Sequence, residues 1–202
     1  MPATPRRDAV ENRAALLAAA RVMLNRDPDS SLEAIAAEAG LSRRAVYGHF
    51  PTRDDLLREV TSLGAARITA ALATTAADDP VVELALIAAR LWSEVESIQV
   101  MAVFAVRGSL RTSIADALAP LRAMVLFAVD RGQAQGVIRT DIEARRLARL
   151  VEDSLLSVFD EATRSALSPA DGHRLVMLSV LGTLGLDWRA AGELIDTTDA
   201  LR

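Results

Sequence analysis

The sequence predicts an all-α fold. Of the 202 residues, 51% are apolar, so the chain can bury a sizeable core, and aromatic residues make up only 3%. The apolar content is mostly Ala, Leu and Val, a composition that packs helices closely. Apolar side chains recur at helical spacing along most of the chain, with no alternating strand pattern, internal repeat or low-complexity linker.

The first two helices have clear sequence boundaries. A tail at residues 1–8 precedes a helix that reaches about Arg26, where DPDS breaks it. Ser31 can then act as the N-cap of a second helix, LEAIAAEAG, because a serine hydroxyl accepts a bond from a free amide of the first turn. Gly40 ends this second helix.

The next two helices follow at once. Ser42 can cap RRAVYGHF, which Pro51 stops. Thr52 begins a longer helix, and Thr52 with Asp55 matches the S/T-x-x-D/E capping box. This fourth helix is expected to run to about Thr75.

Long helices dominate the rest of the chain. Breaks are expected at Gly108, Pro120, GQAQG and the SP dipeptide. The expected spans are 81–107, 109–118, 120–135, 142–166 and 170–187, followed by a short helix from Trp188.

The charges divide the chain into two parts. Residues 1–60 hold nine arginines and nine carboxylates, so the net charge of −4 arises entirely from the remainder. We therefore expect two domains with a boundary inside the helix that starts at Thr52. The domains are residues 1–54, a small three-helix module, and residues 55–202, a larger helical domain.

Residues 31–50, SLEAIAAEAGLSRRAVYGHF, predict a helix-turn-helix. Two short helices are joined by a tight turn that contains a glycine, and the second helix of this motif enters the DNA major groove. Leu41 and Val46 can hold the second helix against the first. The segment 42–53 contains three arginines and no carboxylate, which favours contact with a polyanion.

The side chains of this segment suit DNA. Arginine can make bidentate contacts to guanine, and an alanine can contact a thymine methyl group, so base contacts are expected from Arg43, Arg44 and Ala45. Phosphate contacts, which fix register without carrying sequence information, are expected from Ser31, Ser42, Tyr47, His49 and Arg53. A basic helix face is also compatible with a plain solvated surface, and spacing alone leaves both interpretations open.

A family pattern is present in the same region. A serine starts the second helix, I-A-x-x-A-G-L-S and Y-x-H-F follow, and a basic residue and a leucine complete the pattern. The matching positions are Ser31, Ile35, Ala36, Ala39, Gly40, Leu41, Ser42, Tyr47, His49, Phe50, Arg53 and Leu56. Residues 16–60 thereby resemble the N-terminal domain of the TetR family of bacterial transcriptional regulators. Two features depart from the family: RDPDSS replaces the usual glycine and aromatic residue, and arginine stands where lysine is common at position 53.

The resemblance implies a regulator, by family default a repressor. Such a protein binds double-stranded DNA as a homodimer and is released by a small-molecule effector held in its C-terminal helical domain. Two recognition helices related by a two-fold axis read a palindromic operator. The alternative function is a helical module that binds a ligand or a protein without DNA.

Helical periodicity supports a dimer independently. The last two long helices carry apolar stripes, and the second of these contains small residues. Glycine inside a helix costs up to about 1 kcal/mol relative to alanine, and close approach of another helix would explain it. The expected interface residues are Leu155, Val158, Leu178, Gly182 and Gly185. A partner helix within the same chain is the alternative.

The effector is expected to be largely apolar. Bulky side chains of the central helices can line a cavity, and a few polar groups can anchor a ligand there. Each of these side chains, taken singly, is equally consistent with an ordinary core. The expected pocket residues are Trp92, Gln99, Phe104, Arg107, Met124, Phe127, Glu152 and Phe159.

The sequence does not indicate an enzyme. The chain has two histidines and no cysteine, which excludes disulfides, thiolate metal sites and a thiol nucleophile. No G-x-S-x-G, Walker A or G-x-G-x-x-G motif occurs, so no catalytic residue, metal or cofactor is expected. Apolar runs are far shorter than the about 18–20 residues that cross a membrane, and a cytoplasmic location is expected.

Overall fold

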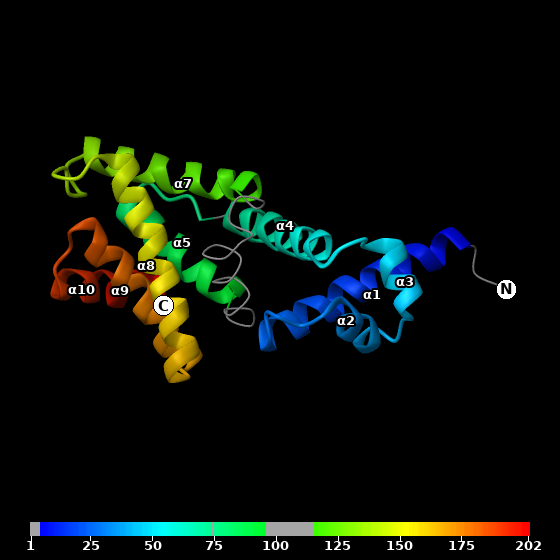
Figure 1. Ribbon diagram of the computed structural model, residues 1–202. Coiled ribbons are helices and arrows are strands. Elements are labelled where there is room, and N and C mark those ends of the chain that lie inside the picture. Colours follow the sequence, from blue (N-terminus) through cyan, green and yellow to red (C-terminus); the bar gives the residue numbers. More distant parts are fainter. Residues whose placement is uncertain (1–4, 74, 96–114) are drawn as a thin grey trace. The chain divides into compact units, whose positions relative to one another are not determined.

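The computed structural model describes residues 5–73, 75–95 and 115–202 (Figure 1). Every regular element in these ranges is a helix, which confirms the all-α prediction for this part of the chain. The chain divides into two compact units. Unit 1 includes the chain up to Ala65, and unit 2 includes residues 66–95 and 116–202.

Unit 1 is built from short and long helices around one apolar core. Its elements are α1 (Pro5–Arg26), α2 (Leu32–Glu38), α3 (Arg43–His49) and the first part of α4 (Arg53–Leu72). The largest fully buried side chains of the core include Leu16, Leu24, Ile35, Phe50, Leu56 and Leu57. The expected tail at residues 1–8 is wrong from Pro5 onward, because α1 already begins there.

The predicted N-caps of the two short helices are confirmed. The Ser31 hydroxyl accepts the amide of Ala34 at 3.1 Å, and the Ser42 hydroxyl accepts the amide of Ala45 at 3.2 Å. Gly40 lies in the turn between them with a φ of +70°, a conformation that glycine adopts without a Cβ penalty. These local signals therefore set where α2 and α3 begin and how the chain turns between them.

The capping box at the start of α4 is also confirmed. The Thr52 amide donates to the Asp55 carboxylate at 3.1 Å, and the Asp55 amide donates to the Thr52 hydroxyl at 3.2 Å. The hydrogen bond from the Thr52 hydroxyl holds the pKa of the Asp55 carboxyl below its usual value. The helix continues past Ala65, so α4 belongs to both units. The sequence-based boundary between residues 54 and 55 also falls in α4 and stays a prediction.

Unit 2 is a helical bundle in which α9 packs against both α5 and α8 (Figure 1). Across the described ranges, none of the helices combines the length and the apolar character needed to cross a membrane. Besides the end of α4, the elements are α5 (Pro80–Val95), α7 (Ala115–Ala134), α8 (Ala144–Ser165), α9 (Pro169–Leu184), α10 (Trp188–Thr197) and a 3-10 turn (Asp199–Leu201).

Trp92 joins three helices of this bundle. Its ring is buried and stacks on Phe159 of α8 with 5.9 Å between centroids, and its indole N–H donates to the Pro169 carbonyl at the start of α9 at 3.0 Å. Gly172 of α9 lies directly against the ring, where an added Cβ would be 2.0 Å from a ring carbon. A glycine is therefore required at this point of α9 by close approach rather than by backbone conformation.

Two expected helix boundaries in unit 2 are wrong. Pro120 does not begin a helix but lies inside α7, which starts at Ala115. Proline removes only one intrahelical hydrogen bond, and burial of later residues such as Val125 and Val129 offsets that loss. Gly185 is not inside the last long helix but follows it, with a φ of +106°. The left-handed C-cap explains this glycine without any helix contact.

We predict that Gly172→Ala destabilises unit 2. The new methyl group would overlap the Trp92 ring, and overpacking of this kind typically costs about 1–3 kcal/mol of unfolding free energy. Denaturant unfolding measures the change. The matched control is Gly64→Ala in α4, where nothing lies within 4 Å of the added Cβ and helix propensity should raise stability by up to about 1 kcal/mol. Equal stability of the two variants would contradict the prediction.

Candidate nucleic-acid interface

The buried side of α3 fixes which residues remain exposed. Val46 and the C-cap residue Phe50 are almost fully buried in unit 1. Arg43 and Arg44 are exposed at the start of the helix, with Ala45 half-buried beside them. The three expected base contacts therefore lie together at the N-terminal end of α3, the end that contacts base edges in a helix-turn-helix.

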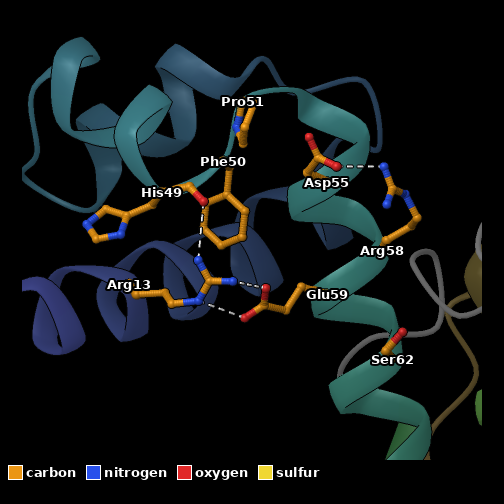
Figure 2. A pocket seen from close by; sticks show the side chains of 8 residues that line it. All are labelled: Arg13, His49, Phe50, Pro51, Asp55, Arg58, Glu59 and Ser62. Carbon is orange, nitrogen blue, oxygen red and sulfur yellow. Dashed lines mark hydrogen bonds and ion pairs between the residues drawn. The ribbon is translucent and has the colours of Figure 1, made fainter.

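Arg13 of α1 holds the other end of α3 (Figure 2). Its guanidinium donates to the His49 carbonyl oxygen at 3.2 Å and makes a two-point ion pair with the Glu59 carboxylate of α4. It also lies over the Phe50 ring, 4.5 Å from the centroid. One side chain thus joins α1, α3 and α4, and it provides a partner for a carbonyl at the helix end that would otherwise lack one.

Sequence reasoning did not identify Arg13, although a signal was present. Arg13 precedes Leu16 and Ala20 by three and seven residues, so it belongs to the apolar face of α1. An arginine on a buried face needs a partner, because an unpaired charge is expensive to desolvate. The identity of that partner, Glu59, depends on tertiary packing that spacing does not reveal.

Arg13, His49, Phe50 and Glu59 are among the residues that line an open hollow of about 520 Å³ (Figure 2). Arg13 pairs with Glu59, and Arg58 pairs with Asp55 at 2.6 Å, so the charges around the hollow are mutually compensated. The imidazole of His49 points away from the Arg13 guanidinium (Figure 2). The imidazole is therefore not engaged by Arg13, and the phosphate contact expected of His49 stays a prediction.

Arg53 has a role in the fold that the sequence did not reveal. Its guanidinium donates to the Ser30 carbonyl at 2.9 Å and to the Pro28 carbonyl, and so fastens the α1–α2 loop to the start of α4. The phosphate contact expected of Arg53 stays a prediction. Two of its donor nitrogens are already engaged, so a phosphate would have to bind the remaining part of the guanidinium.

Tyr47 and Arg43 share a carboxylate from the preceding helix. The Tyr47 hydroxyl donates to Glu33 of α2 at 2.7 Å, and the Arg43 guanidinium is 3.5 Å from the same oxygen and 5.6 Å from the centroid of the Tyr47 ring. The shared hydrogen bond lowers the pKa of the Glu33 carboxyl and raises the pKa of the Tyr47 phenol. Segment 42–53 itself lacks a carboxylate, but the fold brings one to it, which sequence reasoning missed.

The remaining DNA-contact candidates are exposed. Ser31 and Ser42 lie at the N-termini of α2 and α3, and each uses its hydroxyl as the helix cap. Arg44 is exposed and makes no ion pair or hydrogen bond within the part of the chain that the structure describes. Among the arginines of α3, Arg44 is therefore the one whose donors are all available.

The ligand-pocket candidates among the described residues differ in burial, and the cavity they would line stays a prediction. Trp92 and Phe159 are stacked and buried, whereas Phe127 is 63% exposed and lies near Arg131. Glu152 pairs with Arg122 at 2.7 Å, a partner that the sequence did not suggest. Met124 is half-buried. Gln99, Phe104 and Arg107 lie outside the described residues.

The dimer candidates differ in burial. Leu155 and Val158 of α8 are buried within the single chain, so its own core accounts for their apolar character. Leu178 is half-buried, and Gly182 is exposed with no atom within 4 Å of an added Cβ. Gly185 is a helix C-cap, as described above. Of the five candidates, Leu178 and Gly182 are therefore the two that leave room for a helix of a partner subunit.

Within the described ranges, no group of three or more histidine, aspartate or glutamate side chains is arranged to hold a metal ion. Some charged side chains of unit 1 instead form pairs, such as Arg13 with Glu59 and Arg58 with Asp55. Arg44 remains exposed at the start of α3.

Comparison with known proteins finds a family match within unit 1. Residues 15–60 match the tetR family of bacterial regulatory proteins. This stretch contains α2, α3, most of α1 and the start of α4. No curated protein matches the chain.

Solved structures share the fold at low sequence identity. FadR from Bacillus subtilis, a transcriptional regulator solved with stearoyl-CoA, has a TM-score of 0.70 at 16% identity, covering 83% of this chain and 97% of its own. LfrR from Mycobacterium smegmatis, a TetR-like regulator solved with proflavine, has a TM-score of 0.68 at 18% identity, covering 88% and 98%. SmeT, the repressor of the Stenotrophomonas maltophilia efflux pump SmeDEF, has a TM-score of 0.67 at 22% identity, covering 86% and 90%.

We predict that Arg53→Ala lowers the stability of unit 1 by about 1–2 kcal/mol, because two loop carbonyls lose their hydrogen-bond donor. Chemical unfolding followed by circular dichroism measures the loss. The control, Arg44→Ala, removes an exposed arginine without partners and should change stability by no more than about 0.5 kcal/mol. If the two variants were equally stable, the role assigned to Arg53 in the fold would be wrong.

Proposed function

We propose that this chain, whose residues 15–60 belong to the tetR family of bacterial regulatory proteins, is a repressor that binds a palindromic DNA operator as a homodimer. A small, largely apolar ligand in unit 2 releases it. Proteins of this family are DNA-binding transcriptional regulators and not enzymes. The site of action we propose is the cytoplasm, where the operator DNA lies.

The observation that carries the DNA-binding proposal is the exposure of α3. The helix is capped by Ser42, packed through Val46 and tied at its end by Arg13, so its orientation within unit 1 is fixed before DNA arrives. Arg43 and Arg44 remain at its exposed N-terminal end. Pre-ordered donors lose less conformational entropy on binding than flexible ones do.

Dimerisation follows from what one α3 helix can read. A seven-residue helix contacts only a few base pairs, and two copies related by a two-fold axis double the contact. The half-buried Leu178 and the open space beside Gly182 support an interface on α9. Leu155 and Val158 are buried in the core of their own chain, and Gly185 caps α9, so the proposed interface centres on Leu178 and Gly182.

The ligand proposal rests on unit 2 and on its neighbours. FadR was solved with stearoyl-CoA, which has a long acyl chain, and LfrR with proflavine, which has a fused aromatic ring system. In this chain, candidate lining groups are Met124, Phe127 and Phe159, together with Gln99, Phe104 and Arg107. Trp92 is already closed between Phe159 and Gly172, so it can form the wall of a pocket but has little freedom to move.

Release can proceed through α4. The helix spans both units, and Glu59 on α4 is bonded to Arg13, which in turn holds the end of α3. A movement of α4 would therefore act on the recognition helix. A ligand can drive it only by binding one shape of the dimer more tightly than the other.

Selection from random duplexes tests the proposed function. We expect enrichment of an inverted repeat whose half-sites are about 34–36 Å apart, or a multiple of this spacing, as two-fold symmetry requires. Footprinting of the selected duplex should show both half-sites protected. Protection of one asymmetric half-site would contradict the dimer, and failure to enrich any duplex would leave the alternative of a helical module without DNA binding.

We further predict that Arg44→Ala relaxes the base preference at one position in each half-site by about 1–3 kcal/mol, the usual value of a bidentate contact to guanine. Binding of duplexes substituted at single positions measures this. The matched control is Arg21→Ala, which removes one exposed arginine from α1 of the same unit. If both variants lost affinity equally for all sequences, Arg44 would be a phosphate contact and the assignment would fail.

A further inference from the structure

Glu33 places a negative charge against the helix that we propose reads DNA. It lies in the first turn of α2, and its side chain is 41% exposed. Its carboxylate accepts the Tyr47 hydroxyl at 2.7 Å and lies 3.5 Å from the Arg43 guanidinium. The Arg43 guanidinium also lies over the Tyr47 ring, so these three side chains form one cluster that bridges α2 and α3.

The two hydrogen-bond donors of this cluster, Arg43 and Tyr47, are both proposed DNA contacts. Arg43 is a proposed base contact, and Tyr47 is a proposed phosphate contact. A guanine edge and a phosphate both accept hydrogen bonds from these donors, as a carboxylate does. DNA and Glu33 therefore seek the same two donors.

We propose that Glu33 is an intramolecular competitor of DNA that sets the affinity and the salt dependence of operator binding. In the free protein its carboxylate accepts the Tyr47 hydroxyl and pairs with Arg43, so moving these donors onto DNA weakens or breaks their bonds to Glu33. This inference rests on the proposed DNA-binding function and adds to it a residue that weakens binding.

The cluster is not what holds α2 against α3. That packing is made by Leu32, Ile35 and Val46, which are almost fully buried, whereas Glu33, Arg43 and Tyr47 are at the surface. Ion pairs at the surface contribute little to folding, since water solvates the separated charges well. Removal of the Glu33 charge should therefore leave the fold of unit 1 intact.

The exchange of partners has a salt signature. A guanidinium that enters the negative field of DNA, at a base edge as well as at a phosphate, displaces counterions, so binding weakens as salt rises. In the wild-type protein the freed Glu33 carboxylate attracts a cation at the same moment, which cancels part of that release. Without the carboxylate the full release should be seen.

The first experiment compares Glu33→Gln with Glu38→Gln on the selected operator. Glu38 is an exposed carboxylate at the end of the same helix and makes no ion pair or hydrogen bond within the described residues, so its replacement controls for net charge. We expect Glu33→Gln to bind about two- to fivefold more tightly at low salt, the range of an exposed ion pair. Its slope of log affinity against log salt should be steeper by up to about one per subunit.

Each other outcome of the binding experiment overturns the inference. Unchanged or weaker binding by Glu33→Gln would mean that Glu33 does not compete, or that it contacts DNA itself. An equal gain in Glu38→Gln would mean that only net charge matters. If the wild-type protein binds no duplex, the proposed function fails with it, whereas operator binding by wild type with no gain in Glu33→Gln defeats the competitor alone.

A second experiment tests the contact without DNA. Tyr47 is the single tyrosine, so the absorbance of its ionised phenol follows this one side chain. The hydrogen bond to Glu33 raises the pKa of Tyr47 by stabilising the protonated phenol beside a negative charge. Ultraviolet absorbance should show this pKa falling toward its usual value in Glu33→Gln and unchanged in Glu38→Gln. An identical pKa in wild type and Glu33→Gln would show that the contact is absent in solution.

Discussion

The orientation of α3 is the constraint on which the proposed interface of unit 1 depends. An isolated seven-residue helix is not stable in water, because nucleation costs more than so few hydrogen bonds return. The orientation of α3 must therefore come from its surroundings. Ser42 fixes one end, Val46 buries one side, and Arg13 fixes the other end while Glu59 holds the Arg13 guanidinium in place.

This arrangement divides the arginines of unit 1 by function. Arg13 and Arg53 use their donors on backbone carbonyls, and so they hold helices and a loop. Arg43 and Arg44 are exposed at the start of α3, but Glu33 engages the first and leaves the second free. The number of arginines in the sequence therefore overstates how many are available to DNA, because the fold pairs some of them with carboxylates or carbonyl groups.

The sequence predicted local contacts of the structure well and contacts between distant residues poorly. Caps and turns were predicted correctly because Ser31, Ser42 and Gly40 act on backbone groups within three residues of themselves. The prediction that Pro120 starts a helix was wrong, because burial of other side chains of α7 outweighs a local helix breaker. The prediction that Gly185 lies inside a helix was wrong, because α9 ends at Leu184 and Gly185 is its C-cap. The partners of Arg13, Arg53 and Glu33 are 10 to 46 residues away in sequence, so their identity emerges only once the helices have packed.

The central claim is that α3 lies in the major groove of each operator half-site, and directed cleavage tests it most directly. The chain has no cysteine, so Gly48→Cys provides a single attachment point for an iron chelate on α3, where an added Cβ meets no atom within 4 Å. Ala200→Cys, on the exposed C-terminal turn of unit 2, is the matched control. The account predicts strand cleavage inside both half-sites from position 48 and not from position 200. Cleavage that is equal for the two positions, or absent from the half-sites, would contradict it.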